Sequence, residues 1–128
     1  MSQEPSESAK EMVLIAARAA DDKKAGDITI LEMAKLLGIT DYFMICTGAT
    51  DRQTKTIADE VRKQLREAGR KPDRVSGDDL GDWILLDYSD FVVHIFTEEM
   101  NDYYQLERLW KDAPRVAVGD RERSGAQS

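Results

Sequence analysis

The 128-residue chain has few residues that build crosslinks or metal centres, with one cysteine, Cys46, and one histidine, His94. A single cysteine excludes an internal disulfide. One cysteine and one histidine cannot supply the four ligands of a structural zinc site. Cys46 lies in a strand-like run, where a buried and inert thiol is expected. We therefore expect no cofactor, no metal site and a cytoplasmic location.

The chain also lacks a long apolar run and an excess of positive charge. No run approaches the ~20 apolar residues that span a bilayer, and the polar N-terminus "MSQEPSESAKE" is not a signal peptide. With 18 basic and 25 acidic side chains, the formal net charge is −7. Phosphates repel such a domain, so general nucleic-acid binding is disfavoured, whereas a basic protein surface suits it.

The order of predicted elements indicates one α/β domain. Helices are expected to start at Ser8, after Thr50 and after Thr97, where Ser8 begins a capping box and Thr50 and Thr97 are candidate caps. Strands are expected at residues 27–32, 41–48, 71–77, 83–88 and 91–96. This order predicts a mixed five-stranded sheet with helices packed on it. The domain is expected to span residues 8–116, between disordered termini at 1–7 and 117–128.

The stretch "WILLDYSDFVVHIF", residues 83–96, is predicted to form a β-hairpin with a two-residue loop at Ser89 and Asp90. Because side chains alternate along a strand, one face would hold Ile84, Leu86, Tyr88, Phe91, Val93 and Ile95. That face is typical of core. The other would hold Trp83, Leu85, Asp87, Val92, His94 and Phe96. This mixture resembles the centre of a protein-binding patch. The alternative is that a helix covers this face too, with Trp83 and Phe96 in the core.

Catalytic motifs find little support in the sequence. Residues 48–53, "GATDRQ", join a strand to a helix but match neither the P-loop nor GxGxxG. Asp87 and Asp90 flank a turn and would not share one face of a strand, which makes them a poor pair for a divalent metal. The charges at Arg62, Lys63 and Arg66 are expected to be a solvated helix face.

Four blocks, in order, resemble the ribosome silencing factor (Iojap-like) family: "DYF.I.TG", "DRQ", "W.LLDY.D.VVHIF" and "YY.LERLW". The resemblance covers about Ser8 to Val116. It implies a fold related to nucleotidyltransferases but without their catalytic machinery, so we do not expect an enzyme. It also implies binding to large-subunit ribosomal protein L-fourteen. Such binding would block joining of the small subunit and repress translation when nutrients are scarce.

On this interpretation, the expected partner-binding residues are Trp83, Leu85, Asp87, His94, Phe96, Glu98 and Tyr104. Trp83 and Phe96 would anchor the partner, and Asp87 and Glu98 would pair with its basic side chains. His94 would supply a hydrogen bond. Two alternatives stay open. One is a minimal nucleotidyltransferase-like enzyme that uses Asp87, Asp90 and residues 48–53. The other is a homodimer of the free protein, which would mask the patch and could coexist with ribosome binding. No membrane and no direct sequence-specific nucleic-acid contact is expected.

Overall fold

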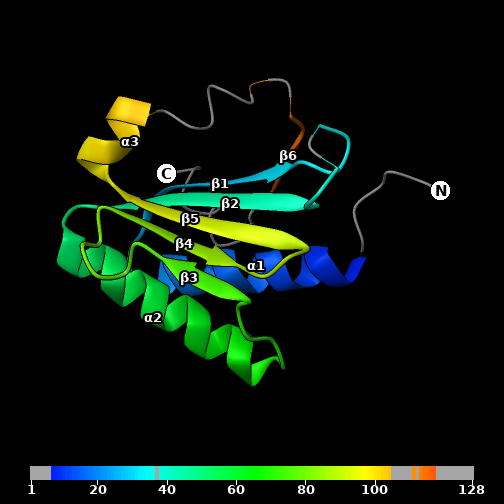
Figure 1. The fold of residues 1–128 in the computed structure, drawn as a ribbon, viewed down its shortest axis with the longest axis horizontal. Coiled ribbons are helices and arrows are strands. Elements are labelled where there is room, and N and C mark those ends of the chain that lie inside the picture. Colours follow the sequence, from blue (N-terminus) through cyan, green and yellow to red (C-terminus); the bar gives the residue numbers. More distant parts are fainter. Residues whose placement is uncertain (1–6, 37, 105–110, 112, 118–128) are drawn as a thin grey trace, which may run out of the picture.

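The computed structural model describes residues 7–36, 38–104, 111 and 113–117. These residues form one sheet with α1 and α2 packed on the same face and α3 at one end of the other face (Figure 1). The elements are α1 (Glu7–Asp22), β1 (Gly26–Glu32), β2 (Tyr42–Gly48), α2 (Asp51–Glu67), β3 (Arg74–Ser76), β4 (Trp83–Asp87), β5 (Phe91–Thr97), α3 (Glu98–Tyr104) and β6 (Arg115–Val116).

The sheet has the strand order β3-β4-β5-β2-β1-β6. The central strands β2 and β5 are parallel, with Met44 opposite Val93, and the other neighbours are antiparallel. The mixed sheet is confirmed, but the prediction of five strands was wrong. The sixth strand, β6, is only two residues long and pairs with β1 at Ile30 and Leu31. So short a strand has no measurable alternation in the sequence.

The predicted hairpin register is confirmed. Trp83 lies opposite Phe96, and the Tyr88 N–H donates to the Phe91 carbonyl at 2.9 Å. The six residues predicted for the core face are at most 1% exposed. They pack, with Cys46, against α1 and α2. Burial raises the pKa of the Cys46 thiol to about 12, so this side chain is an uncharged thiol at neutral pH.

The helix caps agree with the sequence at two of three positions. The Thr50 hydroxyl accepts from the Gln53 N–H at 3.1 Å, and the Thr97 hydroxyl accepts from the Met100 N–H at 3.3 Å. The expected cap at Ser8 was wrong, because α1 already begins at Glu7. None of the described helices is long and apolar enough to cross a bilayer. Most of both termini lies outside the described residues, so their disorder stays a prediction.

Gly77 sets how closely the loop after β3 approaches β4. Its φ is +79°, and a Cβ there would overlap the Trp83 carbonyl oxygen. We expect Gly77→Ala to lower the free energy of unfolding by about 2 kcal/mol, from backbone strain and this overlap. Gly69 has φ +94° but open space around its Cα, so Gly69→Ala should lower it by only about 1 kcal/mol. Urea denaturation measures both; equal losses would mean that the overlap is relieved by a small shift.

Candidate protein-binding site

The face of the sheet opposite α1 and α2, here the outer face, is covered at one end. Phe96 is fully buried there in a small apolar cluster with Leu31, Met33, Ile45 and Ala113. Phe43, Trp83 and Met100 pack against this cluster. Other parts of the chain therefore already bury the Phe96 ring, and its role as an anchor for a partner stays a prediction. The alternative of a covered face holds at this end of the sheet.

Beside this cluster, Trp83 and His94 form a fixed pair. The half-buried Trp83 ring lies 4.9 Å from Phe96, between centroids, and its Nε1–H donates to His94 Nδ1 at 3.3 Å. Since Nδ1 accepts, neutral His94 carries its proton on Nε2, an assignment made from the hydrogen-bond network. Burial lowers the pKa of His94 to about 4, although the charge of Asp87 raises it. The imidazole is therefore neutral at pH 7.

The His94 Nε2–H is a buried donor without an acceptor among the described residues. Its ring meets the edge of Phe43 at 4.6 Å between centroids. A buried polar group without a hydrogen bond typically costs about 1–3 kcal/mol. An acceptor brought in by a partner would recover part of that free energy, but the hydrogen bond expected from His94 stays a prediction.

Toward its other end the outer face forms, among the residues that the structure describes, a cavity of about 320 Å³, here the outer pocket. Its lining includes Ile39, Phe43, Leu85, Asp87, Val92 and His94. Ile39 is 81% exposed, which is unusual for a large apolar side chain and places an apolar group at this site. A mostly apolar pocket with a few polar groups is typical of a binding site. Its volume suits one or two side chains of a protein partner.

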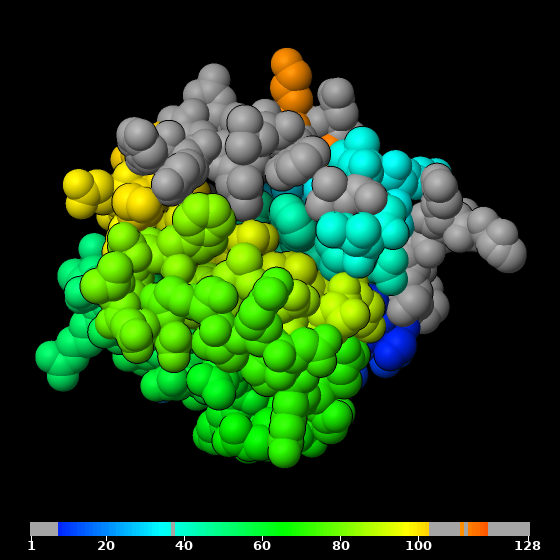
Figure 2. Space-filling model, viewed as in Figure 1, coloured from blue at the N-terminus to red at the C-terminus, as the bar shows by residue number. Residues whose placement is uncertain are grey.

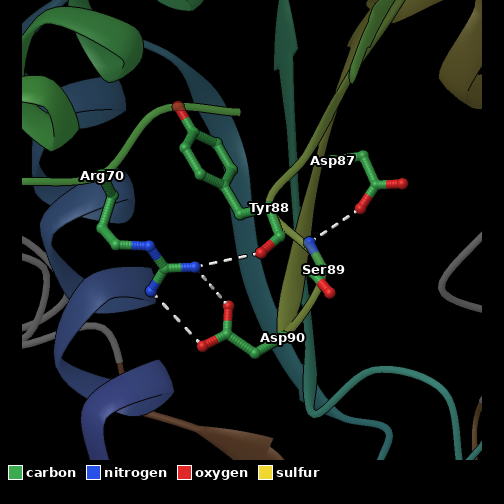
Figure 3. Close-up of polar contacts among 5 residues, drawn as sticks. All are labelled: Arg70, Asp87, Tyr88, Ser89 and Asp90. Carbon is green, nitrogen blue, oxygen red and sulfur yellow. Dashed lines mark hydrogen bonds and ion pairs between the residues drawn. The ribbon is translucent and has the colours of Figure 1, made fainter. Parts of the chain in front are cut away.

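Two carboxylates flank the hairpin turn and lie apart (Figure 3). Asp87 accepts from the Ser89 N–H at 2.8 Å, whereas Asp90 accepts from Arg70 at 2.7 and 3.3 Å. Arg70 also donates to the Tyr88 carbonyl at 3.0 Å. The aspartates that the enzyme alternative needs therefore do not converge on one point. Within the described part of the chain, no group of three or more His, Cys, Asp or Glu side chains is placed to hold a metal ion.

The structure brings together only some of the predicted site residues. Leu85, Asp87 and His94 line the outer pocket. Trp83 does not line it but donates a hydrogen bond to His94, which does. Glu98 is exposed at the start of α3 and is not part of the lining, while the side chain of Tyr104 lies outside what the structure describes. Partner contacts by all these residues stay predictions, as does the homodimer.

Sequence reasoning missed two apolar contributors to the outer pocket, Ile39 and Phe43. Phe43 reaches the outer face because β2 runs parallel to β5, with Phe43 opposite Val92. The run "YFMICT" is apolar on both faces, which is a signal that β2 has side chains for two layers. Ile39 lies between the strands predicted at residues 27–32 and 41–48, where no periodicity could assign it to a surface.

Comparisons with known proteins agree with the resemblance. The model of a family described as "Ribosomal silencing factor during starvation" matches residues 6–128. Ribosomal silencing factor RsfS of Bacillus subtilis is 44% identical, over 82% of this chain and 89% of its own length. A mouse protein named "Mitochondrial assembly of ribosomal large subunit protein 1" is 28% identical, over 69% of this chain and 40% of its own. A crystal structure from Chromobacterium violaceum has a TM-score of 0.77 at 35% identity, covering 80% of this chain and 85% of its own.

Proposed function

Because the chain belongs to the ribosomal silencing factor family, we propose that it binds the large ribosomal subunit and blocks joining of the small subunit. The contact is made with ribosomal protein L-fourteen, in the cytoplasm, and it represses translation when nutrients are scarce. The name of the mouse relative supports the large subunit as the partner. The description of the family supports a role during starvation.

The outer pocket is the observation that carries this proposal. It combines apolar walls at Leu85 and Phe43 with an acidic group, Asp87, and the unused donor of His94. A basic ribosomal protein can fill the apolar space, pair a cation with Asp87 and offer a backbone carbonyl to His94. The net charge of −7 speeds the encounter with such a surface.

The proposed mechanism is steric and requires no chemical step. The chain forms one continuous sheet braced by α1 and α2, so the bound domain is a stiff obstacle. If it occupies a surface of the large subunit that the small subunit must meet, the two subunits cannot dock. Because the mechanism is only steric, the function does not require carboxylates that converge on a metal ion.

Gradient sedimentation tests this function. The protein is mixed with purified large subunits, small subunits are then added, and each fraction is probed for the protein. We expect the protein to migrate with the large subunit and the peak of joined ribosomes to fall. Small subunits alone serve as the control and should not carry the protein. Protein that stays at the top of the gradient, or joined ribosomes at an undiminished level, would contradict the proposal.

A further inference from the structure

Positive charge is concentrated in one short stretch of this acidic chain. Residues 62–74 hold six basic side chains and two carboxylates, a local charge of +4 within a chain of −7. The basic residues are Arg62, Lys63, Arg66, Arg70, Lys71 and Arg74. Such a local excess is not explained by binding to a basic protein, because like charges repel across an interface.

Five of these six side chains line one concavity of about 450 Å³, here the basic groove: Arg62, Arg66, Arg70, Lys71 and Arg74. The groove runs from the last turns of α2 to the edge strand β3. In Figure 2 the green atoms of this region stand at the lower front, next to the yellow-green atoms of the β4–β5 hairpin. The structure therefore gathers cations from a helix, a loop and a strand onto one surface.

The spacing of charges on α2 distinguishes the residues of the groove from those of an ordinary solvated helix face. Asp59, Lys63 and Glu67 recur every four residues with alternating sign, which is stabilising on an exposed helix. Arg62 and Arg66 have the same spacing but the same sign, which is destabilising. Lys63 thus fits the predicted solvated face, whereas Arg62 and Arg66 belong to the groove. The spacing of these two arginines does not stabilise α2.

Most of the groove's charge is left without a counter-ion. No ion pair within 4 Å joins Arg62, Arg66 or Lys71 to any residue that the structure describes. Burial raises the pKa of Tyr88 to about 12, while the nearby charges of Arg62, Arg70 and Arg66 lower it. The charges of three guanidinium groups therefore act on one buried side chain, and an anion would relieve their mutual repulsion.

Arg70 makes part of the groove rigid before any ligand arrives. Its guanidinium is held by Asp90 and by the Tyr88 carbonyl, and it lies 5.5 Å from the centre of the Phe91 ring. The hairpin therefore fixes one wall of the groove. A preorganised arginine reduces the entropy lost on binding.

We propose that the basic groove binds the phosphate backbone of ribosomal RNA, next to the protein partner of the outer pocket. This inference rests on the proposed function, since it takes a ribosomal surface as the target. Asp73 and Arg74 line both the groove and the outer pocket, so the two sites form one continuous surface. A ribosomal surface presents RNA phosphates beside protein, so one docked domain can meet both.

Phosphate suits the groove better than an acidic peptide does. The guanidinium fork binds phosphate oxygens through two parallel hydrogen bonds. Among the described residues that line the groove, only Pro72 and Val75 are apolar, so it offers little to anchor a peptide's side chains. Contacts to phosphate carry no base information, which agrees with the expectation of no sequence-specific nucleic-acid binding.

The test uses a groove variant with Arg62→Gln, Arg66→Gln and Lys71→Gln. Its matched control is Lys10→Gln, Lys23→Gln and Lys63→Gln, which removes the same charge from exposed positions outside the groove. Affinity for purified large subunits is measured at several salt concentrations. We expect the groove variant to bind about 10- to 100-fold more weakly at low salt, with a salt slope lower by about one per cation removed. The control should bind as the wild type does.

A second arm titrates the same three proteins with a labelled RNA duplex of about 20 base pairs, somewhat longer than the ~16 base pairs that a double-stranded-RNA-binding domain spans. The groove variant should again bind at least tenfold more weakly than the control. Equal affinities of the two variants in both arms would overturn the groove proposal. The groove proposal would also be overturned if the groove variant lost as much affinity for isolated ribosomal protein L-fourteen, without RNA, as it loses for large subunits. Failure of the wild type on large subunits, with the RNA difference intact, would overturn the proposed function alone.

Discussion

A Leu85→Arg protein is expected to keep its fold and to bind large ribosomal subunits at least 100-fold more weakly than the wild type. Leu85 is half-buried on β4 and faces the outer pocket, directly opposite His94 across the hairpin. Arginine there would fill the apolar space and turn a cation toward a basic partner. Loss of a central contact typically costs 2 kcal/mol or more, and repulsion adds to it; a 100-fold change corresponds to about 2.7 kcal/mol.

Leu80→Arg is the matched control. Leu80 is 71% exposed and is not part of the outer pocket, so the same substitution there should leave the affinity unchanged. Circular dichroism and thermal unfolding would verify that both variants stay folded. If folded Leu85→Arg bound large subunits as tightly as Leu80→Arg, the partner would have to dock elsewhere on the chain.

The second large effect is a loss of stability in acid that depends on His94. The folded-state pKa of this imidazole is about 4, below the ordinary value of 6.5. In the window between these values the unfolded chain binds a proton that the folded chain does not. Stability is therefore full above pH 6.5 and falls as the pH drops toward 4. The total loss from this one group is about 3 kcal/mol.

His94→Gln isolates this loss because His94 is the only histidine. The glutamine oxygen can still accept from the Trp83 indole, but the side chain does not titrate. Urea denaturation of both proteins at pH 7, 5.5 and 4.5 gives the free energies of unfolding. Carboxylates titrate in both, so they cancel in the difference. We expect the stability of the wild type to fall relative to the variant as the pH drops; a constant difference would show that His94 is not buried in its neutral form.

Local features of the fold could be predicted from the sequence. The hairpin register followed from alternation and a two-residue loop, both of which are set within residues 83–96. The Thr50 cap and the helix after it depend on neighbours three or four residues away. Burial of Phe96 was an alternative that the hairpin's own pattern could not decide. The residues that cover it, including Leu31 and Ala113, are distant in sequence and leave no trace in the hairpin's own pattern.

The same reasoning explains what was found and missed in the site. Alternation placed Trp83 and His94 on one face, but their hydrogen bond depends on the diagonal offset between strands and on ring orientation. The basic groove was missed because helical periodicity considers α2 alone. Arg70, Lys71 and Arg74 reach the same surface only because the chain reverses after α2 and returns as β3.

The parallel pairing of β2 with β5 also determines when the domain can complete its fold during its own synthesis. β2 leaves the ribosome early, with β1 on one side and an unpaired edge on the other, until Phe91–Thr97 has emerged. Pairing between strands so far apart is slow, and an open apolar edge favours association between chains. Nascent copies on one messenger RNA are therefore at risk of joining through β2. Once β5 has emerged, β4 and β5 pair locally across their two-residue loop, so little further delay precedes their addition to β2.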